Sequence, residues 1–178
     1  QAKQIIETQE ALPTRHADSH DVLGTYQIVS SAKEMNVVPQ SPDELLEILK
    51  YRHEILLSAR PEKKPGTFKE INNYAGNTAF VDKNLVKGTL FKAFDFYKAL
   101  KHPFSKAAYL MFVISEIHPF LDGNGRIARI MMNAELVSQK QSRIIIPTVY
   151  REDYILALRK LTRKKDPEAF ISMLSRIH

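Results

Sequence analysis

The chain of 178 residues has no cysteine and no long hydrophobic run. Without cysteine it can form no disulfide, use no thiol nucleophile and bind no zinc through thiolates. A membrane-spanning helix needs about 18 consecutive apolar residues, and neither such a run nor a signal-peptide pattern is found. We therefore expect a soluble, cytoplasmic protein with no membrane partner. The length predicts one domain with a sizeable core.

The formal net charge is +6, from 26 Lys and Arg against 20 Asp and Glu, so nucleic-acid binding has to be weighed. Most basic residues are scattered, and the main cluster comprises Arg159, Lys160, Arg163, Lys164 and Lys165. We interpret it as the solvated end of a helix, because cations complement a helix C-terminus. A non-catalytic nucleotide-binding or nucleic-acid-binding module that uses this cluster is the alternative from another functional class.

Apolar periodicity predicts a mostly helical chain. The expected helices span residues 19–32, 43–57, 84–101, 105–117, 126–139, 151–163 and 166–177. Ser41 before Pro42 and an acidic turn predicts a strong helix start. The segment 109–117 is apolar nearly all round, which predicts a central buried helix. Residues 144–147 predict an extended connector, because a proline ends that β-rich run.

The most informative stretch is HPFLDGNGRIAR, residues 118–129. Gly123 and Gly125 permit a tight turn whose backbone N–H groups converge, and the helix expected after them would present its positive end there. Arg126 and Arg129 project from a different sector of that helix than its apolar face. The stretch therefore predicts a phosphate-binding site kept apart from the core.

At each defined position this stretch matches H-x-F-x-[D/E]-G-N-G-R-x-x-R, the signature of the Fic family. The resemblance extends over roughly residues 40–178. It implies an all-α fold, a Fic-type helical bundle with a short β-hairpin flap beside the active site. It also implies a protein adenylyltransferase that moves AMP from ATP to a Tyr, Thr or Ser hydroxyl of a target protein, or of itself, with Mg²⁺ on the phosphates.

The resemblance implies a role for each motif residue. His118 is expected to be the general base, since an imidazole with an ordinary pKa near 6.5 can take a proton from a hydroxyl at neutral pH. Asp122 would hold Mg²⁺ through a carboxylate oxygen, and a helix cap is a compatible alternative. Phe120 is expected to anchor the loop in the core. The expected nucleotide-binding residues are Gly123, Asn124 and Gly125 at the α and β phosphates, Arg126, Arg129 at the terminal phosphate, and Asn133, which could equally be an ordinary polar surface residue.

Residues 66–81 interrupt the helical pattern. The resemblance implies a flap here that docks the target, with the residues Gly76, Asn77, Thr78, Ala79 and Phe80. Residues 78–81 are expected to be a short edge strand, on which a peptide could be held by main-chain hydrogen bonds with its hydroxyl near His118. An ordinary glycine-containing connector is the alternative.

We interpret residues 1–40 as an N-terminal helical segment and linker, around Leu12-Pro13-Thr14, and residues 41–178 as the Fic core domain. The chain opens in mid-pattern, which suggests a larger N-terminal part. Many Fic proteins are inhibited by a helix bearing [S/T]-x-x-x-E-[G/N], whose glutamate pairs with the second motif arginine, here Arg129. No such motif is found, and the nearest segment offers only Glu7. We expect the motif upstream of Gln1 or on another chain, either an inhibitory partner or a second copy.

Other chemistry on the same fold stays an alternative. Related enzymes transfer UMP, a phosphate or phosphocholine, or remove AMP from a modified target. The intact Gly125-Arg126 pair favours a nucleotide donor over the phosphotransferase Doc branch, which departs from the G-N-G-R sequence at this point.

Overall fold

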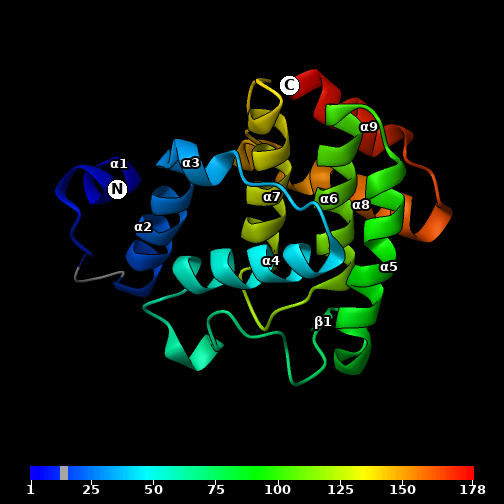
Figure 1. The fold of residues 1–178 in the computed structure, drawn as a ribbon. Coiled ribbons are helices and arrows are strands. Elements are labelled where there is room, and N and C mark those ends of the chain that lie inside the picture. Colours follow the sequence, from blue (N-terminus) through cyan, green and yellow to red (C-terminus); the bar gives the residue numbers. More distant parts are fainter. Residues whose placement is uncertain (13–15) are drawn as a thin grey trace.

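Two helices, α6 (Pro103–Ile117) and α7 (Asn124–Ser138), lie side by side at the centre of the fold (Figure 1). The structure is a computed structural model that describes residues 1–12 and 16–178. Leu110, Met111, Ile114 and Ile117 of α6 are buried, as expected for a helix that is apolar nearly all round. The predicted central buried helix is therefore confirmed, and it ends directly before His118.

The other helices surround this pair (Figure 1). α4 (Pro42–Leu56) crosses one end of the pair, and α5 (Val86–Ala99) packs along α6. α8 (Arg151–Lys164) and α9 (Glu168–Ile177) pack on each other. On the N-terminal side, α2 (His16–Ser30) contacts α4 and α7, and α1 (Ala2–Thr8) and α3 (Ala32–Met35) contact α2.

Capping side chains set two of the helix boundaries. The Ser41 hydroxyl accepts a hydrogen bond from the Glu44 N–H at 3.1 Å, and Pro42 occupies the first turn, so the predicted start of α4 is confirmed. The single helix predicted over residues 19–32 is wrong at its C-terminal end. Ser31 caps a separate helix there by accepting from the Glu34 N–H at 3.1 Å.

The expected hairpin is present between α4 and α5. β1 (Tyr74–Ala75) pairs antiparallel with β2 (Thr78–Ala79), with Tyr74 opposite Ala79 and Ala75 opposite Thr78. Gly76, at a φ of 58°, begins the two-residue turn, a backbone region that glycine adopts readily. The second strand is two residues long rather than the predicted four, and 3-10 turns lie at Pro61–Lys63, Lys83–Leu85 and Thr148–Tyr150.

The N-terminal segment contains α1, α2 and α3, and Pro13 and Thr14 of the expected linker lie outside the described residues. The division into a segment of residues 1–40 and a core domain stays a prediction. Residues 141–147 contain no helix or strand, which agrees with a connector at residues 144–147. Within residues 1–12 and 16–178, no helix is long and apolar enough to cross a membrane.

Candidate active site

The motif loop joins the two central helices through two residues with left-handed backbone. His118 caps the C-terminus of α6 at a φ of 50°, and its N–H donates to the Ile114 carbonyl at 3.0 Å. Gly123 caps the N-terminus of α7 at a φ of 74°. A left-handed backbone is uncommon for a residue other than glycine, and such residues concentrate at functional sites. The two rigid helices thus fix both ends of the loop.

Buried contacts hold the motif loop, residues 118–123, against the core. Phe120 is fully buried, and its ring stacks on His53 of α4 with centroids 3.8 Å apart and an interplanar angle of 4°. The Asn124 side chain closes the loop, since it accepts from the Phe120 N–H at 2.9 Å and donates to the Phe120 carbonyl at 2.8 Å. The anchoring role expected for Phe120 agrees with this packing. Because these two bonds engage the side-chain amide of Asn124, its backbone N–H is the group that can bind an anion.

His53 connects the motif loop to the segment that precedes the hairpin. Its Nδ1 accepts from the Gly66 N–H at 3.0 Å, so the ring proton sits on Nε2, which donates to the Asp122 carbonyl at 3.1 Å. Burial lowers the pKa of His53 to about 4, against the weaker opposing effect of Asp122. His53 is therefore uncharged at neutral pH.

The His118 ring is oriented for proton acceptance. Its Nδ1 lies 2.6 Å from the Ser115 carbonyl, which can only accept, so Nδ1 carries the proton and Nε2 keeps its lone pair. Burial lowers the pKa of His118, the Ser115 hydrogen bond opposes that shift, and the charge of Lys69 adds to it. Phe80 from the end of the hairpin stacks on the imidazole with centroids 3.6 Å apart.

A cavity of about 320 Å³ opens beside His118. Its walls come from the hairpin region, the motif loop and the first turns of α7: Asn73, Tyr74, Ala75, Phe80, His118, Leu121, Asp122, Gly123, Asn124, Gly125, Arg126 and Arg129. The N–H groups of Asn124 and Gly125 precede the first hydrogen bonds within α7, which run from residues 126 and 127 to the Gly123 carbonyl. This wall therefore offers backbone donors and the positive end of a helix to an anion.

The two motif arginines differ in their partners. Arg126 forms an ion pair with Asp21 of α2 at 2.5 Å and lies 3.8 Å from Asp122. Arg129 has no carboxylate within 4.0 Å among the described residues, and burial lowers its pKa, with a further contribution from Arg126. A partly buried, unpaired guanidinium that faces a cavity attracts an anion strongly, because the low dielectric strengthens the interaction.

Asp122 is the one acidic residue among the described residues that line this cavity. Its Oδ1 accepts from the Gly123 N–H at 2.6 Å, while its Oδ2 lies 3.7 Å from Arg60 and 3.9 Å from Lys63. Gly123, not Asp122, is the N-cap of α7, so the helix-cap alternative is wrong. No cluster of three or more His, Cys, Asp or Glu side chains that could hold a metal is found in the described part of the chain. One carboxylate fits Mg²⁺ when phosphates complete the coordination.

Asn133 lies apart from the other expected residues. Its amide donates to the carbonyls of Arg129 and Ile144, both at 3.0 Å, and accepts from the Ile144 N–H at 2.7 Å. These bonds tie the 141–147 connector to α7, and Asn133 is not in the cavity wall. Its role in nucleotide binding stays a prediction, which these contacts do not favour.

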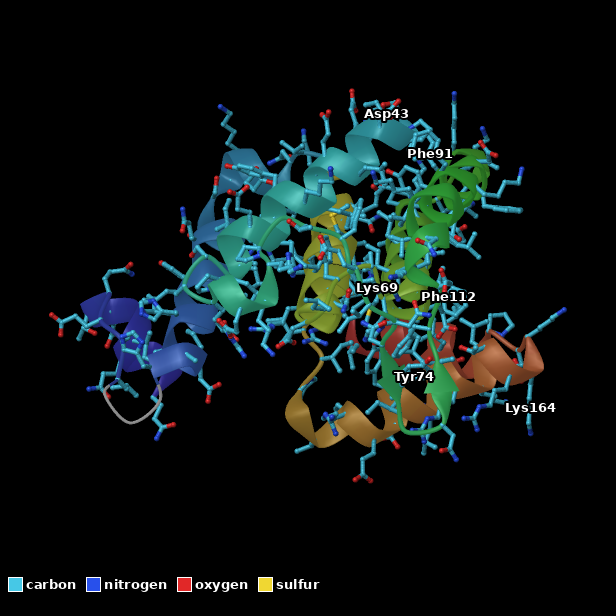
Figure 2. The ribbon with its side chains drawn as sticks, turned by 90° about the horizontal axis from the view of Figure 1, so that it is seen from below. Asp43, Lys69, Tyr74, Phe91, Phe112 and Lys164 are labelled. Carbon is cyan, nitrogen blue, oxygen red and sulfur yellow. The ribbon has the colours of Figure 1, made fainter. Side chains whose placement is uncertain are left out.

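The hairpin region forms part of the cavity wall. Tyr74, Ala75 and Phe80 line the cavity, and Tyr74, labelled on the hairpin in Figure 2, is exposed. Gly76 and Asn77 form its exposed tip, and a Cβ on Gly76 would meet no atom within 4 Å. Docking of a target along residues 76–80 stays a prediction.

Several residues of the site were not predicted. The sequence does indicate that His53 is buried, because it follows Leu45 and Leu49 at helical spacing on the buried face of α4. Asp21 and Lys69 had no such signal, because they reach the motif only through tertiary packing. Glu7, the weak candidate for the inhibitory glutamate, is exposed on α1 and lies 3.7 Å from Lys3.

Comparison with known proteins gives consistent matches. A model of the Fic/DOC family matches residues 42–136. The chain is 25% identical over 179 residues to the protein adenylyltransferase Fic of Drosophila willistoni, covering 98% of this chain and 36% of that protein. It is 30% identical over 103 residues to a Fido domain-containing protein of Dictyostelium discoideum, covering 55% of this chain and 72% of that protein. The chain thus spans about a third of the length of the Drosophila relative.

Solved structures show the same fold. A Fic domain containing signaling protein from Bacteroides thetaiotaomicron has a TM-score of 0.82 at 21% identity, covering 99% of this chain and 75% of that one. Fic-1 from C. elegans has a TM-score of 0.79 at 20% identity, covering 99% and 54%. The predicted Fic-type helical bundle with a short hairpin is confirmed.

Proposed function

The chain belongs to the Fic/DOC family, and we propose that it transfers AMP from ATP to a hydroxyl group of a target protein, and to itself. The observation that carries this proposal is the combination of Arg129, unpaired and facing the cavity, with a histidine whose Nε2 is free to take a proton. An anion site next to a base fits attack of a hydroxyl on a phosphate ester.

In the proposed reaction, the hydroxyl oxygen of the target forms a bond to the α-phosphorus of ATP. His118 takes the hydroxyl proton at Nε2, the bond from the α-phosphorus to the bridging oxygen breaks, and pyrophosphate leaves. The product is a phosphodiester between AMP and the target side chain. The uncharged ring and its Nδ1 bond to Ser115 support this role, because they aim a lone pair at the incoming proton.

The phosphates would be held by the start of α7. The N–H groups of Asn124 and Gly125 would bind the α and β phosphates, and Arg126 and Arg129 the remaining phosphate oxygens. Arg126 would have to exchange part of its pairing with Asp21 for this contact.

Asp122 is the residue that would hold Mg²⁺. The ion would neutralise charge on the transferred and leaving phosphates. The neighbouring Arg60 and Lys63 weaken the field of this carboxylate, so we expect the metal to bind together with the nucleotide rather than before it.

The target would lie along the hairpin. Residues 78 and 79 form a very short strand whose partner is β1, so the outer edge of β2 is available to an extended peptide. Phe80, stacked on His118, would set the depth at which the hydroxyl-bearing side chain enters.

Intact-mass spectrometry tests the proposal. The chain is incubated with Mg²⁺ and each nucleoside triphosphate in turn, alone and with candidate target proteins. We expect a mass increase of one AMP with ATP, absent from His118→Ala. The matched control is His102→Ala, an exposed histidine at the start of α6, which should transfer at the wild-type rate. The same yield from His118→Ala and wild type would refute the role of His118. A mass increase that corresponds to another group would identify that group, rather than AMP, as the one transferred.

A further inference from the structure

Lys69 is a buried lysine close to the motif, and the proposed reaction leaves it without a role. It lies in the segment between α4 and the hairpin and is only 3% exposed. Figure 2 labels Lys69 and, at the end of α8, the exposed Lys164. A lysine is almost never buried to this extent unless its ammonium group has partners.

The partners of Lys69 lie on both sides of His118. Its backbone N–H donates to the Pro119 carbonyl at 2.8 Å, and its Nζ donates to the Ile117 carbonyl at 3.2 Å. Nζ also donates to Asn73 Oδ1 at 2.8 Å. Lys69 is therefore bonded to the residue before the catalytic imidazole and to the residue after it.

The same contacts place a cation at the C-terminal end of α6. Ile117 is the last residue of that helix, and its carbonyl is one of the groups that no helical N–H satisfies. A cation at this end interacts favourably with the helix dipole, which explains how the ammonium group tolerates burial. Burial lowers the pKa of Lys69, and the charge of Asp82 opposes that shift.

We propose that Lys69 is a positioning residue for proton transfer, which fixes the backbone on both sides of His118 and keeps the imidazole uncharged. The inference rests on the proposed role of His118 as the base. A positive charge near the ring disfavours a second proton on it. The ring then stays ready to accept the hydroxyl proton at the pH of the reaction.

Other charged and titratable groups near His118 can also affect its pKa, and the test must distinguish their effect from that of Lys69. Arg126, Arg129 and Asp122 line the same cavity, and Tyr154 of α8 lies 3.3 Å from the Ser115 hydroxyl. Burial is the largest cause of the lowered pKa of His118, and the Lys69 charge is a smaller one. Removal of the Lys69 charge should therefore raise this pKa only in part.

The first experiment is an NMR titration of the His118 imidazole, assigned by comparison with His118→Ala. The variants are Lys69→Met, the neutral Lys69→Gln, which keeps donor groups, and Lys69→Arg, which keeps the charge. The matched control is Lys87→Met, an exposed lysine on α5 that lines a neighbouring cavity together with Lys69. We expect the pKa of His118 to rise in the Met and Gln variants, and to stay at the wild-type value in Lys69→Arg and Lys87→Met.

A His118 pKa that is unchanged in both neutral variants would overturn the proposal, as would an equal rise in Lys69→Arg. If Lys69→Met does not fold, Lys69→Gln decides the question alone. The second measurement is the pH profile of self-modification with ATP, whose acidic limb should move upward together with the pKa. Absence of transfer in the wild type would contradict the proposed function, while the titration would still decide whether Lys69 controls His118.

Discussion

Replacing His53 by glutamine should make the free energy of unfolding depend less on pH below pH 6.5. Burial holds the pKa of His53 at about 4 in the folded chain, against about 6.5 for an unfolded histidine. Between these values the unfolded chain binds the proton more readily than the folded one. The stability linked to His53 is thus fully present above pH 6.5 and is lost as the pH falls towards 4.

The magnitude follows from the two pKa values. A shift of one pKa unit corresponds to 1.36 kcal/mol, so titration of His53 should cost about 2 to 3 kcal/mol between pH 7.5 and pH 4.5. At pH 7.5 the His53→Gln variant loses the ring stacked on Phe120 and strains the bonds to Gly66 and Asp122, so it should be less stable than wild type by about 1 to 3 kcal/mol. The two stabilities should converge near pH 4.5.

The assay is urea unfolding at half-unit steps of pH, with His102→Gln as the control because its side chain is exposed. His118 contributes in the same direction, since burial lowers its pKa as well, so the variant should keep a smaller slope. The reasoning is refuted if His53→Gln loses as much free energy of unfolding on acidification as the wild type.

Two further predictions concern other buried hydrogen bonds. Tyr97→Phe removes the hydroxyl that donates to the buried Glu135 at 2.6 Å, so the free energy of unfolding should fall by about 1 to 3 kcal/mol while ATP affinity is unchanged; an unchanged midpoint of urea unfolding would contradict this. Asn133→Ala leaves the N–H and the carbonyl of Ile144 without their side-chain partner, so the free energy of unfolding should fall by a similar amount. ATP affinity, measured by calorimetry, should change little. Loss of ATP affinity at full stability would instead make Asn133 a nucleotide ligand.

Local chemistry made much of the fold predictable from the sequence. The start of α4 is set by Ser41 and Pro42, and the central position of α6 by its apolar composition, so both could be read directly. The break at Ser31 was missed, because a serine inside an apolar pattern reads as a helix interior until its hydroxyl is seen to accept from Glu34.

The candidate site was predictable only where it is contiguous. Residues 118–129 bring a base, a carboxylate and two arginines together by their spacing alone. Asp21 and Lys69 carried no such signal, because they come from other elements and meet the motif through packing. The helical spacing of His53 indicates its burial but not its bond to the Asp122 carbonyl. The spacing also could not reveal that the Asn133 amide is occupied by the connector.

The separation of these contributors along the chain has a consequence for folding kinetics. Asp21 and Arg126 stand more than a hundred residues apart and yet pair at 2.5 Å, and Lys69 reaches the end of α6 from the opposite side of α5 in the sequence. Contacts of such separation form late, since the loop between them must close first. During refolding the helices should therefore appear before the site is complete, and regain of nucleotide binding should follow the slowest phase of assembly rather than the recovery of helical signal.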